Sequence, residues 1–166
     1  MPDRKTMERA AEDKREGKAP TTQAGEFVRE EMHHIREGKH GARSTKQAIA
    51  IGLSKARRAG VKLPAPKKGT VSEETRKSAA RETAAGARGA KPASPRRSRA
   101  ITAALKREGH TAASKSALAR HAKSAARKRT AGARSAAARK AVKTKGPTLR
   151  SAAARKAART RARSTG

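Results

Sequence analysis

The last 58 residues of the chain carry 17 lysines and arginines and no aspartate or glutamate. A segment with this balance has no side-chain carboxylate of its own to pair with its cations, and like charges one helical turn apart repel each other. Repulsion of this kind opposes any compact state. Residues 109–166 therefore cannot form a globular domain by themselves, and they must stay solvated or condense onto a polyanion.

Large apolar side chains are too few for a core of ordinary size. Alanine accounts for 39 of the 56 apolar residues, and Ile, Leu, Val and Phe together number 14, about 8% of the chain. This share is below the roughly 20% under which a high net charge predicts disorder. With a formal net charge of +31, the composition predicts a mainly α-helical protein with extensive disorder. We expect a small helical hairpin, a polar linker and a basic, alanine-rich tail of marginal helices.

Changes in composition divide the chain into five expected segments. Residues 1–20 are a polar arm with helical potential, and residues 21–64 hold most of the larger aliphatic side chains and the expected hairpin. Residues 65–97 are a linker with one marginal helix, and residues 98–131 are a basic helical pair. Residues 132–166 are a basic repeat tail that is disordered or folds on binding.

Two apolar stripes with helical spacing predict the hairpin. Its expected core consists of Phe27, Val28, Met32, Ile35, Ile49 and Leu53. Each such side chain contributes about 1.5–3 kcal/mol if fully buried, whereas ordering a residue costs about 1.5 kcal/mol. The hairpin therefore needs further cover, from a second copy, from another segment of the chain or from a ligand.

Helix ends are predicted from capping residues. Candidate N-caps are Thr21 or Thr22 for the first hairpin helix, Ser44 with Gln47 for the second, Thr70 with Glu73 for the linker helix, and Ser94 and Ser114 for the basic pair. Gly38 and Gly60 are candidate C-terminal caps of the two hairpin helices.

The tail contains a repeat. RSAAARKAVKTK at residues 134–145 and RSAAARKAARTR at residues 150–161 match at nine of twelve positions, with Gly146-Pro147 between them. Alanine is the best helix former, so each unit is predicted to be a helix of about three turns. Three cations of each unit then share one broad helical face, and the other two point elsewhere.

Nucleic acid is the polyanion that this charge fits best. Neutralising phosphates releases counterions, and the pI of 11.9 exceeds the value of about 9 that marks such a footprint. The cations expected to contact nucleic acid are Arg96, Arg97, Lys123, Arg127, Lys128, Arg129, Arg134, Arg139, Lys140, Lys143, Lys145, Arg150, Arg155, Lys156, Arg159, Arg161 and Arg163.

A secondary contact is expected from the second hairpin helix, through Lys46, Lys55, Arg57 and Arg58. This helix could act as the recognition helix of a helix-turn-helix motif. The connecting loop, however, is longer than the usual turn of about 3–4 residues. Sequence-specific reading of DNA is therefore the weaker interpretation of these cations.

The scarcity of aromatic residues favours duplex DNA. Phe27 is the only aromatic residue, whereas modules for RNA and single strands stack bases on aromatic rings. We expect binding without sequence preference, in the cytoplasm at the nucleoid. An RNA- or ribosome-associated protein is the alternative. A third hypothesis is an interaction protein whose hairpin docks a partner, and a homo-oligomer formed through the hairpin stays open.

Catalytic, metal and membrane signals are missing from the sequence. There is no Walker A, GxSxG or HExxH motif, and there is no cysteine. His33, His34 and His40 lie near Glu30 and Glu37, in a pattern typical of the solvated face of an amphipathic helix. No apolar run reaches the length of about 18 residues that spans a membrane, and the N-terminus lacks the apolar region of a secretory signal. We expect no enzyme, metal, cofactor, membrane partner or small-molecule substrate.

Residues 22–60 resemble an uncharacterised family of small basic bacterial proteins. The shared element is a short acidic and apolar helix, a Gly/Lys loop and a K-Q-A-I-A-I-x-L-S-x-A-R helix. The resemblance implies a bacterial source and brings no established chemistry, although members are called DNA-binding because of their basic tails.

The C-terminal part carries a second resemblance, which is one of composition. From about residue 98 onward the chain is similar to the Ala/Lys/Arg-rich tails of bacterial histone-like proteins and eukaryotic linker histones. Ser94-Pro95-Arg96-Arg97 resembles the S-P-basic-basic turns of linker-histone tails, which lie in AT-rich minor grooves. These resemblances imply a histone-like role in binding duplex DNA.

Overall fold

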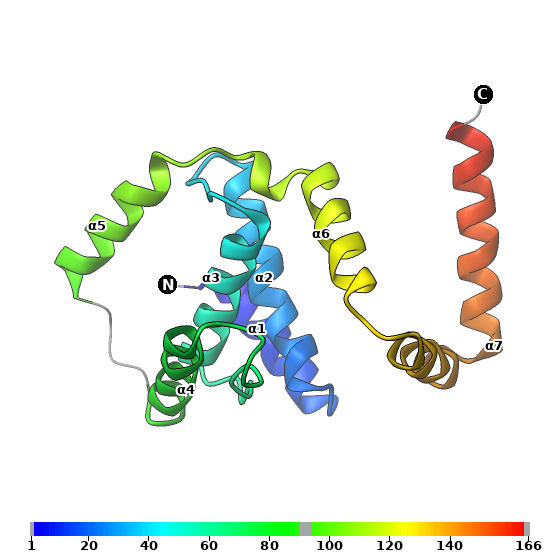
Figure 1. The fold of residues 1–166 in the computed structure, drawn as a ribbon, viewed down its shortest axis with the longest axis horizontal. Helices are drawn as coiled ribbons and strands as arrows, with labels where there is room; N and C mark the ends of the chain where they lie inside the picture. The colour runs from blue at the N-terminus through cyan, green and yellow to red at the C-terminus, as the bar shows by residue number, and fades with distance from the viewer. Residues whose placement is uncertain (1, 90–93, 165–166) are drawn as a thin grey trace. The chain divides into compact units, whose positions relative to one another are not determined.

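A computed structural model describes residues 2–89 and 94–164, with only the backbone of Thr144, Lys145 and Ser164. The expected helical class is confirmed, because all regular structure in these residues is helical (Figure 1). The elements are α1 (Arg4–Arg15), α2 (Pro20–Arg36), α3 (Thr45–Arg58), α4 (Glu73–Ala87), α5 (Pro95–Lys106), the 3-10 turn η1 (Thr111–Ala113), α6 (Lys115–Arg127) and α7 (Ala131–Ser164). None of the helices within these residues is long and apolar enough to cross a membrane.

Two compact units make up the chain, Met1–His121 and Ala122–Gly166. At the centre of the first unit, α2 and α3 form the expected hairpin (Figure 1). The two helices approach closely at Gly52, where an added Cβ would lie 2.7 Å from Cα of Val28. Only glycine fits at this contact, because real Cβ atoms do not approach backbone that closely.

Buried apolar side chains form two clusters, one toward each end of the hairpin. The first contains Ala10, Ala24, Phe27, Ala56, Val61 and Leu63, with Leu53 partly buried against it. The second contains Met32, Ile35, Ala42, Ala48, Ala112 and Ala113, with Val28, Ile49 and Leu118 partly buried against it. Of the six expected core residues, Phe27, Met32 and Ile35 are buried in these clusters, and the other three are partly buried against them. The other members of the clusters are mostly alanines, which a pattern of large apolar side chains does not include.

Other segments of the chain cover the hairpin. Helix α1 packs against α2, and α4 packs against α3. Gly86 of α4 lies so close to α3 that an added Cβ would clash with the carbonyl oxygen of Arg57. Thr83 of α4 also donates a hydrogen bond to the carbonyl oxygen of Leu63, at 3.1 Å. The sequence left open whether a second copy, another segment of the chain or a ligand covers the hairpin. In the structure, other segments of the chain cover it.

Residues 105–113 dock on the loop end of the hairpin through hydrogen bonds. The backbone N–H of Gly41 donates to Leu105 O (2.9 Å), and that of Ala42 donates to Gly109 O (3.0 Å). Thr45 Oγ1 donates to Ala112 O (2.7 Å), and Arg36 Nε donates to Ala113 O (2.8 Å). A Cβ on Gly41 would collide with the backbone of Glu108. This docking joins residues some seventy positions apart, and no local pattern predicted it.

Two of the predicted N-caps are wrong. Helix α2 begins at Pro20, before Thr21 and Thr22, because proline has the backbone angle of a first helical residue and needs no N–H there. Helix α4 is capped by Ser72 instead of Thr70, since Ser72 Oγ accepts from the N–H of Thr75. The first turn of α4 holds Glu73, and a hydrogen bond from Arg76 lowers the pKa of its carboxyl group.

The other N-caps are in place. Ser44 caps α3 by accepting from the N–H of Gln47 at 3.2 Å. The Gln47 side chain reaches back one residue further than a capping box requires, to the N–H of Arg43 at 2.8 Å. Ser114 Oγ accepts from the N–H of Ala117 at 3.2 Å, whereas Ser94 directly precedes α5 without a side-chain capping hydrogen bond. Gly38 and Gly60 have the positive φ angles expected after the hairpin helices.

The close contact at Gly52 generates a stability prediction. Gly52→Ala should lower the free energy of unfolding by about 1–3 kcal/mol, because the new methyl group overpacks the crossing with Val28. The matched control is Gly25→Ala in α2, where nothing lies within 4 Å of an added Cβ. In this control the free energy of unfolding should rise by about 0.5–1 kcal/mol, because alanine favours the helix more than glycine does. Denaturant unfolding followed by circular dichroism measures the free energy of unfolding of both variants. Equal changes in the two variants would contradict the close contact at Gly52.

Candidate nucleic-acid interface

The repeat units of the tail lie in two helices. The helical stretch from Ala131 to Ser164 is broken at Gly146, which has non-helical angles of φ 65° and ψ 172° (Figure 1). Proline at position 147 adds to the break, because it lacks an N–H and its ring clashes with the preceding turn. Residues 134–145 lie before this break and residues 150–161 after it, so each predicted unit lies within one continuous helix.

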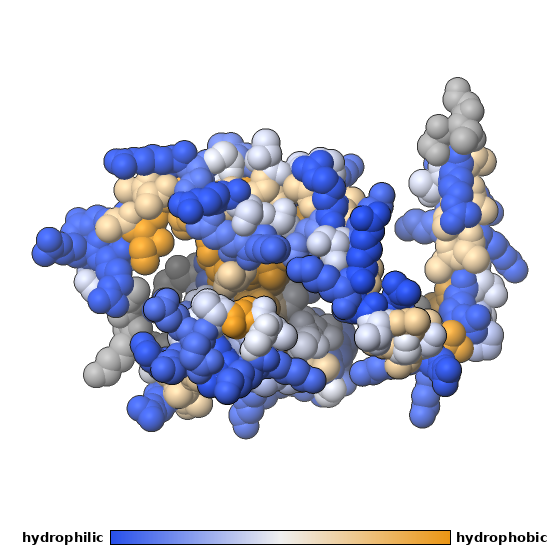
Figure 2. Space-filling view, viewed as in Figure 1, coloured by the Kyte–Doolittle hydropathy of each residue, from blue (hydrophilic) through white to orange (hydrophobic). Residues whose placement is uncertain are grey.

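The described cations of the tail are exposed. Figure 2 shows hydrophilic side chains projecting around the small apolar ones along α7. Among the residues predicted to contact nucleic acid, the exposed ones are Arg96, Arg97, Lys123, Arg127, Lys128, Arg129, Arg134, Arg139, Lys140, Lys143, Arg150, Arg155, Lys156, Arg159, Arg161 and Arg163. The side chain of Lys145 lies outside the described part of the structure. Arg96 and Arg97 lie in the first turn of α5, so they belong to a helix and not to a linker-histone type of turn.

The helical periodicity separates the cations of each unit into two sets. With about 100° of rotation per residue, Arg139, Lys140 and Lys143 fall within one arc of about 100°. Arg134 points to nearly the opposite side. The second unit repeats this arrangement sixteen residues further along the chain. The tail helices therefore present cations on two faces, as the sequence predicted.

Lys55 does not contribute a free cation to a surface. Its ammonium nitrogen lies 2.6 Å from Glu31 Oε2 and 3.7 Å from Glu30 Oε1. Both glutamates are buried, and Glu31 is fully so. Lys55 therefore compensates charge inside the protein, and its predicted role as a secondary nucleic-acid contact is not supported.

Arg57 is also used internally. Its side chain is buried at 6% exposure, and it donates to the carbonyl oxygen of Pro64 at 3.4 Å. Lys46 and Arg58 are the exposed members of the predicted secondary contact. The side-chain oxygen of Gln47 accepts from the N–H of Arg43, so this side chain is also used within the protein and is not free to read a DNA base.

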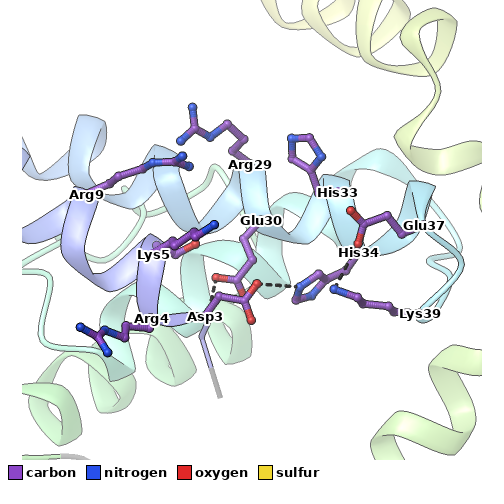
Figure 3. A pocket seen from close by; sticks show the side chains of 11 residues that line it. Asp3, Arg4, Lys5, Arg9, Arg29, Glu30, His33, His34, Glu37 and Lys39 are labelled. Carbon is purple, nitrogen blue, oxygen red and sulfur yellow. Dashed lines mark hydrogen bonds and ion pairs between the residues drawn. The ribbon is translucent and has the colours of Figure 1, made fainter.

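A groove of mixed charge lies between the start of α1 and the middle of α2 (Figure 3). Its walls include Arg4, Lys5, Arg9, Arg29 and Lys39, together with the carboxylates of Asp3, Glu30 and Glu37 and the rings of His33 and His34. Several of these carboxylates are already in contact with cations or donors. The groove is thus chemically different from the acid-free tail.

The histidines near this groove do not share one solvated face. His33 is exposed, as the sequence predicted. The side chains of His34 and His40 are only 13% exposed, and each contacts a carboxylate, at 3.3 Å to Asp3 and at 3.2 Å to Glu31. The prediction is therefore wrong for His34 and His40. The sequence feature that could have predicted buried partners for these histidines is Glu31. It lies four residues from both Phe27 and Ile35 and thus on the buried stripe of α2.

Comparison with known proteins supports the resemblance of the hairpin region to an uncharacterised family. Residues 19–68 match the sequence model of a family of unknown function (DUF6496). The match covers α2, α3 and the segment that follows them, and it does not extend into the tail. No curated protein and no solved structure matches the chain.

The internal role of Lys55 can be tested by its removal. Lys55→Ala should lower the free energy of unfolding by about 3 kcal/mol, because it leaves two buried carboxylates without their ammonium partner. Arg58→Ala, at the exposed end of the same helix, should change it by less than about 0.5 kcal/mol. Thermal and denaturant unfolding compare the two variants. A Lys55 variant as stable as the Arg58 variant would show that the buried pair matters little.

Proposed function

We propose that this protein binds duplex DNA without sequence preference, as a histone-like, nucleoid-associated protein. The observation that carries the proposal is the acid-free segment 109–166 with its 17 cations. These cations are exposed wherever their side chains are described, and all but Lys128 and Arg129 lie on helices. Phosphate neutralisation with counterion release is the favourable step for a segment of this kind. The first unit, which matches the family of unknown function in part, serves in this proposal as the docking or assembly module.

The size of a repeat unit suits a phosphate backbone. Twelve residues extend about 18 Å as a helix, and that length of duplex carries about ten phosphates. Each unit holds five cations, so one unit neutralises about half of the charge along its length. Successive units can then lie along successive stretches of duplex, and binding is strongly salt-dependent.

Contact with phosphate also stabilises the tail helices in this proposal. Cations four residues apart, such as Arg155 and Arg159, repel each other on an isolated helix. A bound phosphate removes this repulsion, while alanine supplies the intrinsic helix preference. The tail therefore gains helix stability when it binds.

The absence of available aromatic rings supports duplex DNA over RNA. The single aromatic residue, Phe27, is fully buried in the first unit. No phenylalanine, tyrosine or tryptophan ring in the chain is therefore available to stack on an unpaired base, which is the usual means of recognising RNA loops and single strands. RNA binding stays the alternative, and it is one arm of the experiment below.

Deleting residues 131–166 tests the proposal. The deletion removes eleven cations, so it should abolish most of the affinity for duplex DNA. The slope of log K against log salt should flatten by up to about ten. A chain with the same segment shuffled at constant composition should bind like the wild type, because phosphate contacts carry no sequence information.

Fluorescence anisotropy in a salt series measures these affinities, with a duplex and a structured RNA of equal charge as the two ligands. Unchanged affinity and salt slope after the deletion would contradict the proposal and point to the hairpin as the binding element. Tighter binding to the RNA at every salt concentration would favour the RNA-associated alternative.

The two faces of the tail helices predict that the protein bridges and compacts DNA. The double variant Arg134→Gln/Arg150→Gln removes two cations from the side opposite the three clustered cations of each unit, here called the narrow face. The double variant Arg139→Gln/Arg155→Gln removes two cations from the clustered side, the broad face. Both pairs should weaken binding to one duplex by a similar factor. Only the narrow-face pair should strongly reduce bridging, measured as energy transfer between two differently labelled duplexes. Equal bridging by both variants would show that the faces are not distinct.

A further inference from the structure

Five potential metal ligands gather where α2, the following loop and the start of α1 meet. They form two overlapping groups, Glu31 with His34 and His40, and Asp3 with Glu30 and His34. Within each group the ligand atoms all lie within 4.8 Å of one another. Figure 3 shows Asp3, Glu30 and His34 turned toward one another in the groove beside α2.

The electric charge of this cluster is unbalanced. The two buried carboxylates, those of Glu30 and Glu31, share one ammonium partner, that of Lys55. These three side chains carry a formal charge of −1, so the side-chain cation in contact with the buried carboxylates does not fully neutralise them. Glu31 is fully buried, and within the described structure its two carboxylate oxygens accept no hydrogen bond of good geometry. Buried carboxylates in this state favour a bound cation.

The orientation of His40 supplies an independent argument. Its Nδ1 lies 3.1 Å from the carbonyl oxygen of Gly41, and a carbonyl can only accept, so Nδ1 carries the hydrogen. In the neutral ring Nε2 then has a lone pair, and this nitrogen lies 3.2 Å from Glu31 Oε1. Two acceptors at that distance require a proton or a metal ion between them. A metal-binding histidine characteristically donates its other N–H to a backbone carbonyl, as His40 does here.

His34 completes a group of three ligands. It lies one turn along α2 from Glu31, and its ring stands edge-on to that of His40 with the centroids 6.1 Å apart. Ligand atoms around one tetrahedral Zn²⁺ are about 3.4 Å apart, so the three side chains need only small rotations to converge. Glu31 Oε2 keeps its contact with Lys55, in the manner of the outer contacts that orient metal-binding carboxylates.

We propose that Glu31, His34 and His40 bind one Zn²⁺ ion. Two imidazoles and one carboxylate are a ligand set for zinc, whereas Mg²⁺ and Ca²⁺ prefer oxygen ligands alone. This site lies outside the basic tail, so it is independent of the proposed DNA binding. It also replaces the expectation, drawn from the sequence, that the chain holds no metal site.

Binding of the ion has a structural consequence. His40 directly precedes Gly41 and Ala42, whose N–H groups hold the segment that ends α5. Zinc therefore ties the loop that docks residues 105–113 to the middle of α2. A ligand that binds only the folded state stabilises it, so zinc should raise the melting temperature of the first unit.

The site is tested by titrating Zn²⁺ into the full-length protein. The protein is first freed of nucleic acid in high salt and of metal with a chelator. Isothermal calorimetry with Zn²⁺ should show one ion per chain. His34→Gln and His40→Gln should each weaken binding at least about tenfold and remove the zinc-induced rise in melting temperature. The matched control is His33→Gln, since His33 is the exposed neighbour of His34 on the same helix, and it should bind like the wild type.

X-ray absorption at the zinc edge of the wild-type complex gives a readout that does not depend on how the variants fold. It should show two imidazoles in the coordination shell, and a shell without them would overturn the site. Wild-type affinity in both the His34 and His40 variants, or Mg²⁺ binding as tight as Zn²⁺ binding, would overturn it as well. Because no nucleic acid is present, neither result bears on the tail.

Discussion

The close contact between α2 and α3 at Gly52 is the constraint on which the first unit depends. Because Gly52 lacks a side chain, α3 can lie directly against the backbone at Val28. This approach lets small residues form a core with few large apolar side chains, in two clusters that are rich in alanine. Helix α1, helix α4 and residues 105–113 then attach to a surface that the paired helices create together.

The distribution of acids determines how the two parts of the chain differ. Twelve of the 13 acidic residues precede residue 90, and the remaining one, Glu108, precedes the tail. In the first unit they neutralise cations locally, even in the interior, where Lys55 faces Glu30 and Glu31. The tail has no acidic side chain within its own sequence. A charge pattern of this kind permits a packed unit and a solvated basic segment in one chain, and it supports the proposed division of labour between docking and DNA binding.

Local patterns predicted the helices well and their packing poorly. The apolar stripes located the hairpin and six residues that are buried in its core or packed against it. Ser44, Ser94 and Ser114 marked helix starts correctly. Propensity failed at Thr21, Thr22 and Thr70, where a neighbouring proline or serine forms the better start. The cover supplied by residues 105–113 could not be foreseen, because it depends on backbone hydrogen bonds between segments with no pairing signal in the sequence.

The sequence by itself determined the helical class, the acid-free tail, its two repeat units and the break at Gly146, because each follows from composition and local backbone preference. Only the tertiary structure decided which cations are available. Lys55 and Arg57 have the same charge as Arg58, and they differ because packing directs them inward to Glu31 and Pro64. The same packing brings Glu31, His34 and His40 together from a helix and a loop. Such a convergence depends on the angle between segments, which no linear pattern encodes.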